Sequence, residues 1–538
     1  MRLIHKTGTM KKTILLLLPL LLTTACSHTK IIERPEIALN SSTNYLSLER
    51  VVCTPEATRL DLTVCCIPGK GFSIEKEAYL QSRESGLKYV LTGAEGIEPG
   101  KKIKTDSTGL VDISLLFEPI PTDEKQIDFI ESEDWQLFGI DLSKKKKPVQ
   151  IECLIEGTVI NRPQSSAILL NTSEKVFDRH TKGNIVIPIR NGKFSYLLRT
   201  DTCTTYGLCF NDEWVNGCML NKIFFAEPGS IYLTIEGDDS VHIEGGKLTE
   251  EYQNIQKYGR DRLQPIYDKR DSLYDIEKLY TPEIYALFKE MDNCNDPTQR
   301  GLLGEKFQNL RVEGKAYSRE GNALQKEAEQ THAEIDRIAG QPSLATYYLL
   351  FEKIKRAVVY SRQTIPDSII EIYRTLYKPI YPDHPFTRDI EQYIKAQQSF
   401  VGGKYIDIVL PDTTGTTYRL SDLLQGCKIA LIDFWSIHCG PCRRTSKAMI
   451  PVYEKYKDKG FRIVGISRDG RQQMIRGIHH DGYPWINLID EYNKNQVFKS
   501  YGIENTAGYT FLVDGNGTIV ASGASVEEMI SLIEKYCK

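Results

Sequence analysis

The feature that most constrains the fold is a cysteine pair between a buried strand and a helix near the end of the chain. The run CKIALIDFW, residues 427–435, is apolar and rich in β-branched and aromatic residues, which favours a buried strand. The run CGPCRRTSKAMIPVYEKY, residues 439–456, predicts a helix that begins at the cysteines. Pro441 suits the first turn, because no N–H donor is needed there. Cys439 and Cys442 are therefore expected side by side in one helical turn.

This placement suits thiol chemistry. Backbone N–H groups and the positive end of the helix dipole stabilise a thiolate at the N-cap or in the first turn. We therefore predict Cys439 as the attacking nucleophile, with the lower pKa and the greater exposure. Cys442 can then attack a mixed disulfide from within, an intramolecular step favoured by proximity.

Strands and helices alternate around this pair. The runs FRIVGISRD, residues 461–469, and TFLVD, residues 510–514, predict strands, and GNG, residues 515–517, predicts a hairpin turn before TIVASG. Alternation of this kind is typical of an α/β domain. Residues 401–538 are therefore expected to form one α/β domain.

The motif FWSIHCGPC, residues 434–442, resembles the FW…WCGPC signature of thioredoxins. The run LPDTTGTTYRLSDLL, residues 410–424, resembles the lead-in of the membrane-tethered, periplasmic TlpA and ResA group of thiol-disulfide oxidoreductases. This resemblance covers about a quarter of the chain. It implies a thioredoxin-like fold, protein disulfide substrates, re-reduction by a membrane thiol donor, and no cofactor beyond a redox-active Cys439–Cys442 disulfide.

The resemblance also implies roles for further residues. Asp433 lies where thioredoxins keep a buried acid and would take the proton from Cys442, directly or through water; a partly exposed strand-end aspartate is the alternative. The residues expected to shape the site are Trp435, His438, Gly440, Pro441, Gly508 and Tyr509. Positive charge that favours the thiolate is expected from His438, Arg443, Arg444 and Lys447. A C-G-P-C pair, as in thioredoxin at ~-270 mV against ~-120 mV for DsbA, favours a reductase over an oxidase.

Three positions depart from the thioredoxin pattern. His438 replaces the tryptophan before the first cysteine, and Lys447 replaces the proline five residues after the second. Gly508 stands where the family has a cis-proline that shapes the substrate groove and keeps metal off the dithiol. A cis bond without proline costs ~3 kcal/mol. We therefore expect a trans peptide and a looser groove at Gly508.

The first 26 residues predict an export signal. Lys11 and Lys12 precede an apolar run, residues 14–22, that is too short to span a bilayer. The ending TTAC resembles a bacterial lipobox, although Thr23 stands where leucine is usual, and translation is expected to start at Met10. Cys26 is therefore the predicted lipid anchor, which implies a lipoprotein of the cell envelope that faces the periplasm from the inner or outer membrane. A plain cleaved signal is the alternative.

Upstream of the α/β domain the composition predicts several domains. We expect a linker at 27–50, a β-sandwich at 51–148, a second β-sandwich at 149–248 and a helical region at 249–400. In TRLDLTVCCI, period-2 alternation places Cys66 on the core face of a strand and Cys65 on the other face. Asn191-Gly192 between two alternating runs predicts a hairpin. These domains are similar to uncharacterised regions that precede this module in lipoproteins of Bacteroides-like bacteria.

Charge and composition separate the remaining function classes. The formal charge of -3, from 68 basic and 71 acidic residues, gives no overall electrostatic reason to expect nucleic-acid binding. A zinc site would need more than one cysteine pair with His438, His479 or His480. A peroxiredoxin would need a P-x-x-x-T/S pattern before one peroxidatic cysteine, and this pattern is missing. The alternative from a different class is a lipoprotein whose β-sandwiches bind a partner while the α/β module serves as a non-catalytic platform.

Overall fold

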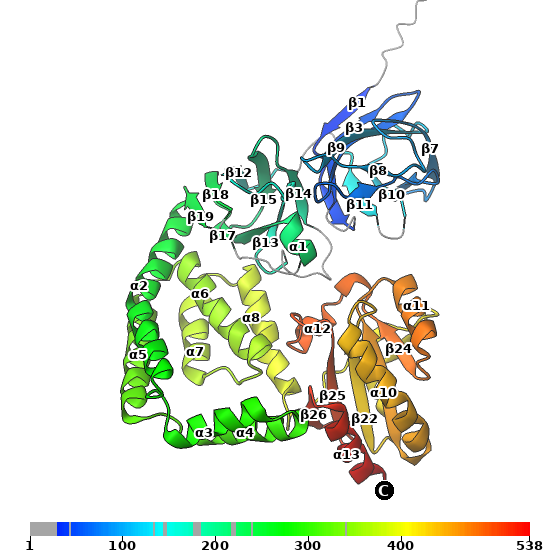
Figure 1. The fold of residues 1–538 in the computed structure, drawn as a ribbon. Coiled ribbons are helices and arrows are strands. Elements are labelled where there is room, and N and C mark those ends of the chain that lie inside the picture. Colours follow the sequence, from blue (N-terminus) through cyan, green and yellow to red (C-terminus); the bar gives the residue numbers. More distant parts are fainter. Residues whose placement is uncertain are drawn as a thin grey trace, which may run out of the picture.

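The fold is taken from a computed structural model that describes residues 29–41, 45–132, 135–143, 148–175, 184–216, 222–237, 240–338 and 342–538. Figure 1 shows two β regions, a helical arch and a C-terminal α/β domain in chain order. The predicted export signal and Cys26 lie outside the described residues. Among the helices that are described, none is long and apolar enough to cross a membrane.

The first β region, residues 30–142, is built on a single nine-stranded sheet in the order β1-β3-β4-β9-β7-β6-β10-β11-β2. Its strands are β1 (Lys30–Glu33), β2 (Ile37–Asn40), β3 (Leu46–Cys53), β4 (Thr58–Cys65), β6 (Tyr79–Ser82), β7 (Lys88–Glu95), β9 (Leu110–Phe117), β10 (Gln126–Ile130) and β11 (Gln136–Asp141). A separate short pair is formed by β5 (Gly71–Phe72) and β8 (Ile103–Lys104). The edge strands β1 and β2 are joined by only three residues, so the sheet curls until its two edges meet around one core.

This arrangement corrects two sequence predictions. A single curled sheet takes the place of the predicted β-sandwich at residues 51–148, and the predicted linker at 27–50 instead contributes β1, β2 and most of β3. The strands β1 and β2 have only four residues each, so their pattern is short, and their partners come from β3 and β11. The alternation in β4 is confirmed: Cys66 joins the core of this region and Cys65 points to the other side.

The second β region, residues 151–244, contains two four-stranded sheets that share one core. One sheet has the order β15-β12-β18-β19, from β12 (Ile151–Val159), β15 (Lys193–Thr200), β18 (Gly229–Ile235) and β19 (Val241–Glu244). The other has the order β14-β13-β16-β17, from β13 (Ala167–Thr172), β14 (Ile185–Pro188), β16 (Thr205–Phe210) and β17 (Lys222–Phe225), with the short helix α1 (Asn211–Asn216). The predicted turn at Asn191-Gly192 forms, but its two strands enter different sheets after one bridge, Arg190 to Lys193.

The helical region, residues 247–399, forms an arch beside the second β region (Figure 1). Its helices are α2 (Lys247–Asp275), α3 (Pro282–Asn293), α4 (Pro297–Val312), α5 (Arg319–Ile338), α6 (Leu344–Lys355), α7 (Asp367–Ile372) and α8 (Pro385–Ala396), with shorter turns η1 (Arg356–Tyr360), η2 (Tyr373–Tyr377) and η3 (Gln397–Ser399). The long helices α2 and α5 pair with each other, and α3 and α4 lie at the far end of this arm. Phe225 of β17 packs into the core around α6 and α8, which joins the helical region to the second β region.

The C-terminal domain has a five-stranded sheet in the order β24-β23-β22-β25-β26, with the first three strands parallel and the last two antiparallel. Its elements are β20 (Val409–Pro411), β21 (Thr417–Arg419), α9 (Leu420–Leu424), β22 (Ile429–Trp435), α10 (Gly440–Tyr456), η4 (Lys457–Lys459), β23 (Phe461–Ser467), α11 (Arg471–Asp481), β24 (Ile486–Ile489), η5 (Glu491–Asn493), α12 (Val497–Ser500), β25 (Tyr509–Asp514), β26 (Ile519–Ser522) and α13 (Val526–Cys537). The central strand β22 is buried along its whole length, as its apolar sequence predicts. It leads directly into the cysteine pair.

Candidate active site

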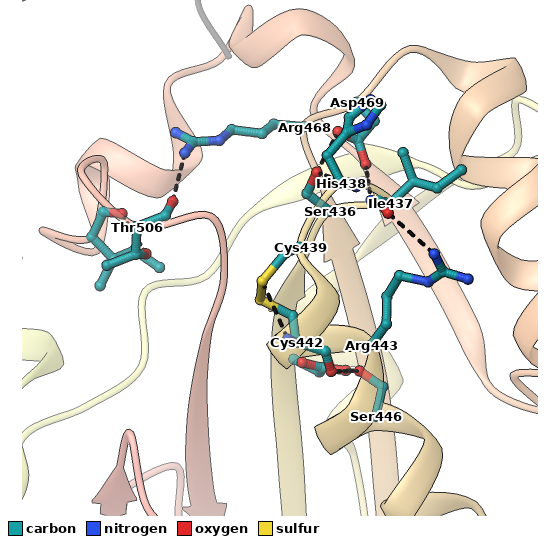
Figure 2. The surroundings of a disulfide bond; sticks show 12 residues. Ser436, Ile437, His438, Cys439, Cys442, Arg443, Ser446, Arg468, Asp469 and Thr506 are labelled. Atoms are coloured by element: carbon teal, nitrogen blue, oxygen red, sulfur yellow. Dashed lines mark hydrogen bonds between the residues drawn. A yellow bond between two sulfur atoms is a disulfide. The ribbon is translucent and has the colours of Figure 1, made fainter. Parts of the chain in front are cut away.

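Cys439 and Cys442 lie at the start of α10 and form a disulfide with a Cα–Cα distance of 5.3 Å (Figure 2). Cys439 is the N-cap of the helix, and its Sγ accepts the backbone N–H of Cys442 at 3.2 Å. Pro441 occupies the first turn, where its missing N–H leaves no bond unmade. The helix terminus therefore directs a hydrogen bond at the sulfur of Cys439, as the sequence predicts.

The exposure of the two cysteines differs from the prediction. In the disulfide form Cys439 is only 8 % exposed, whereas Cys442 is half-buried. The short loop before the helix forms a turn, in which the Cys439 N–H donates to Ser436 O at 3.0 Å. The case for Cys439 as the nucleophile thus depends on its N-cap hydrogen bond and not on greater exposure.

Asp469, which the sequence reading did not single out, fixes that loop. Its carboxylate accepts the Ser436 hydroxyl at 2.8 Å and the Ile437 N–H at 2.7 Å. It lies two residues after the end of β23 and is buried. An acid just past a buried parallel strand is the one signal in the sequence that could have indicated it.

Asp433 lies behind the pair on β22 and is 2 % exposed, which excludes the alternative of a partly exposed strand-end residue. Burial raises the pKa of Asp433 to about 6, although a hydrogen bond from Ser446 opposes this. Ser446 Oγ donates to Asp433 Oδ2 at 2.6 Å and also lies 3.0 Å from Cys442 O, one helical turn away. Ser446, another residue absent from the sequence prediction, therefore connects the buried acid to the turn that carries Cys442.

Two of the positive side chains near the site, Arg443 and Lys447, pair with one buried acid, Asp481. Arg443 donates to both of its carboxylate oxygens, at 2.6 and 2.8 Å, and Lys447 Nζ lies 3.5 Å from Oδ1. The Arg443 bonds hold the pKa of Asp481 well below its usual range. Arg444 and His438 are exposed and have no carboxylate partner among the described residues. The predicted positive field is thus weaker than four separate charges would give.

Gly508, just before β25, lies directly against the pair. A Cβ added at this position would lie 2.5 Å from Cys442 Sγ and 2.4 Å from Phe434 O, closer than real Cβ contacts allow. No peptide bond in the described residues is cis, so the predicted trans peptide at Gly508 is confirmed. The backbone of Gly508 therefore lies close to Cys442 Sγ, and the looser substrate groove stays a prediction.

The other residues expected to shape the site support it from different sides. Trp435 is fully buried, and its ring N–H donates to Asn487 Oδ1 at 2.9 Å. Gly440 and Pro441 are exposed in the first turn of α10, and the Arg444 guanidinium lies near Gly440. Tyr509 follows Gly508, and its ring packs at a tilt against Phe511, with 5.2 Å between the ring centroids. Trp435 therefore belongs to the core of the site, and the other three form its rim.

The zinc alternative finds no support in the geometry. His480 Nδ1 lies 2.9 Å from Asp481 Oδ1 and 3.0 Å from Arg443 Nη2, and His479 is exposed on α11. Within the described ranges, no group of three or more histidine, cysteine or acidic side chains is arranged to hold a metal ion.

A disulfide at the N-terminus of a helix, after the central strand of a mixed five-stranded sheet and backed by a buried acid, defines a thioredoxin-like redox domain. A family model described as "AhpC/TSA family" matches residues 401–522. The chain is 30% identical over 133 residues to thiol-disulfide oxidoreductase ResA of Geobacillus kaustophilus, a match that covers 24% of this chain and 74% of that protein. The ResA of Geobacillus thermodenitrificans is 29% identical over the same coverage. This chain therefore belongs to the family of ResA-type thiol-disulfide oxidoreductases and is an enzyme of that class.

Solved structures of similar domains come from Bacteroides species. The thioredoxin domain of a thiol-disulfide oxidoreductase from Bacteroides vulgatus is 29% identical and covers 26% of this chain and 98% of that one, with a TM-score of 0.24. A thiol:disulfide interchange protein from a Bacteroides species is 29% identical and covers 26% of this chain and 90% of that one, also with a TM-score of 0.24.

Proposed function

We propose that this protein is an envelope-located disulfide reductase that uses Cys439 as nucleophile, Cys442 as resolving thiol and Asp433 as proton acceptor. The observation that carries the proposal is the N-cap position of Cys439, whose sulfur accepts the Cys442 N–H. That hydrogen bond and the helix dipole both favour the thiolate of Cys439 over its thiol.

In the proposed reaction the Cys439 thiolate attacks one sulfur of a protein disulfide, and the other sulfur leaves as a thiolate that takes up a proton. Cys442 then loses its proton and attacks Cys439 Sγ of the mixed disulfide. The second substrate sulfur leaves, the Cys439–Cys442 disulfide forms, and two electrons have passed to the substrate. A thiol donor in the membrane would reverse this change in the pair and ready it for another turnover.

Asp433 suits the proton step because its pKa of about 6 lies near neutral pH, where a general base is most effective. The Ser446 hydroxyl lies between the Asp433 carboxylate and the backbone carbonyl of Cys442, and so ties the acid to the turn that carries this cysteine. We propose that the Cys442 proton passes to Asp433 directly or through water and leaves the site from there.

We further propose that the protein is anchored by lipid on Cys26 and faces the periplasm, with the upstream regions, divided near residues 148, 248 and 400, between the anchor and the redox domain. The support is the short apolar run before TTAC. A fatty-acid analogue should label the wild type and leave Cys26→Ala unlabelled. Equal labelling of both proteins would remove the anchor from the proposal.

The decisive test of the catalytic roles is trapping. Cys442→Ser should accumulate mixed disulfides with envelope proteins on non-reducing gels, because the resolving thiol is missing, and mass spectrometry should place the bond at Cys439. Cys439→Ser is the matched control and should trap none. Trapping by Cys439→Ser alone would reverse the assignment, and no trapping with no disulfide reductase activity in the wild type would favour the non-catalytic platform.

A further inference from the structure

The helical region contacts several residues of the segment 499–508 in the C-terminal domain, which ends at Gly508 beside Cys442. At its start, Lys499 pairs with Asp389 of α8 at 2.6 Å, and both side chains are mostly buried. Further along, the fully buried Tyr393 of α8 donates its hydroxyl to Glu504 Oε1 at 2.5 Å. Two side chains of one helix thus hold the approach to Gly508.

Arg362, which follows η1, holds the middle of the same segment. Its guanidinium donates to Tyr501 O at 2.7 Å and to Ser399 O at 3.0 Å, so it joins the two regions directly. The guanidinium also lies over the ring of Tyr509, 5.4 Å from the ring centroid. Tyr509 is the residue that follows Gly508. At Gly502 an added Cβ would lie 3.0 Å from Val358, which shows how closely the helical region packs here.

Arg468 holds the segment from within the C-terminal domain. It donates to Thr506 O at 2.6 Å and to Glu504 O at 3.2 Å, and Figure 2 shows its side chain reaching across to Thr506. Gly508 itself has no side chain with which to anchor its backbone, and glycine has the greatest conformational freedom of any residue. The position of Gly508 against Cys442 therefore has to come from the contacts on its two sides.

We infer that the helical region is a positioning element of the redox site: through Arg362 and Tyr393 it fixes residues 499–508 and so sets the equilibrium between the Cys439–Cys442 disulfide and its dithiol. The inference rests on this pair being the redox site of the proposed function, but it assigns a role to a region outside the thioredoxin-like domain. Arg362 and Tyr393 touch neither sulfur, so they are positioning residues.

The physical reason lies in what reduction does to the pair. A thiolate of dithiothreitol attacks one sulfur of the disulfide, and its second thiolate then releases the protein from the mixed disulfide. Dithiothreitol becomes a cyclic disulfide, and the protein gains two electrons and two protons as two thiols. The two protein sulfurs must then separate from bonding distance to van der Waals contact, yet Gly508 confines Cys442 Sγ. A firmly held segment therefore disfavours the dithiol, and a loosened one permits it.

The test is the equilibrium of the full chain with mixtures of reduced and oxidised dithiothreitol, read by thiol alkylation and mass spectrometry. Tyr393→Phe and Arg362→Gln should each raise the equilibrium constant for reduction about two- to tenfold, a change of the size of one net hydrogen bond. Amide hydrogen exchange should become faster in residues 499–508 of both variants.

Tyr373→Phe is the matched control, because Tyr373 also donates its hydroxyl to a glutamate, Glu391 at 2.7 Å, but entirely within the helical region. It should leave the constant and the exchange of residues 499–508 unchanged. The inference is overturned if Tyr393→Phe and Arg362→Gln keep the wild-type constant, or if Tyr373→Phe changes it equally. Since dithiothreitol replaces any protein substrate, a positive result would stand even if trapping by Cys442→Ser failed.

Discussion

Cysteines come together in two very different parts of the molecule. Cys65 and Cys209 share a buried apolar cluster with Ala167, Leu169 and Val186, where the first β region meets the second. Burial raises the pKa of Cys209 to about 12 and that of Cys65 well above its usual range. Cys439 instead receives a backbone N–H at a helix terminus. The groups around its sulfur therefore decide whether a cysteine is an unreactive part of the core or a nucleophile.

The largest expected difference is in thiol reactivity. In the fully reduced, folded chain at pH 7, iodoacetamide should modify Cys439 at least about 100-fold faster than Cys65 or Cys209, because only Cys439 has a stabilised thiolate. Peptide mass spectrometry over a time course measures each rate. Adding denaturant should bring all three rates together, and similar rates in the folded chain would break the comparison.

The second prediction concerns the proton acceptor of the redox site, because Asp433 lies behind the Cys439–Cys442 pair. Asp433→Asn should slow disulfide reduction at pH 7 about 100-fold and remove the rise in rate centred near pH 6. Steady-state rates between pH 5 and 8 measure this. Ser446→Ala should retain the profile but shift it to higher pH, because the serine hydroxyl lowers the pKa of Asp433.

Asp433→Asn, which should slow the reaction, should stabilise the folded protein at neutral pH. The folded protein keeps the Asp433 proton up to about pH 6, whereas the unfolded chain releases it near pH 4. The contribution of this group to the free energy of unfolding therefore falls by about 3 kcal/mol as the pH rises from about 4 to 6 and stays low above that. Asp433→Asn should lose this fall and unfold at a higher temperature at pH 7; an unchanged melting profile would contradict the assigned burial of the charge.

The smallest effect is expected from adding a side chain at Gly508, beside Cys442. Gly508→Ala should destabilise the disulfide form by about 1–3 kcal/mol, because its Cβ would overlap Cys442 Sγ. Gly301→Ala in α4 is the control: no atom lies within 4 Å of an added Cβ there, and alanine favours the helix by up to about 1 kcal/mol. Melting temperatures of the oxidised proteins distinguish the two, and equal shifts would show that Gly508 does not confine the sulfur.

Local patterns predicted the parts of the fold in which neighbours in sequence are neighbours in space. The buried strand before Cys439, the helix after it and the two faces of β4 all follow from short-range periodicity. The strands β1 and β2 do not stand out from a linker in the sequence, because four residues carry little periodicity and their pairing partners lie elsewhere in the chain. The turn at Asn191-Gly192 formed, but nothing local indicates that its strands enter different sheets.

The candidate site shows the same limit. Cys439, Cys442 and Asp433 could be named because they lie in one continuous stretch of sequence. Asp469 and Asp481 act on that stretch from 32 and 38 residues away, so no spacing rule indicates them. The fit of Gly508 against Cys442 depends on a loop whose course is fixed by the helical region, a contact between parts of the chain that are remote in sequence.

The short distance along the chain between Cys26 and β1 has a consequence for how the enzyme would stand on a membrane. An extended chain spans at most about 3.6 Å per residue, so a lipid on Cys26 would leave β1, which begins at Lys30, within about 15 Å of the bilayer surface. The curled sheet would rest close to the lipid headgroups, and the thioredoxin-like domain lies on the side of the first β region that is away from β1 (Figure 1). The upstream regions would then act as a spacer that sets the height above the bilayer at which electrons are exchanged.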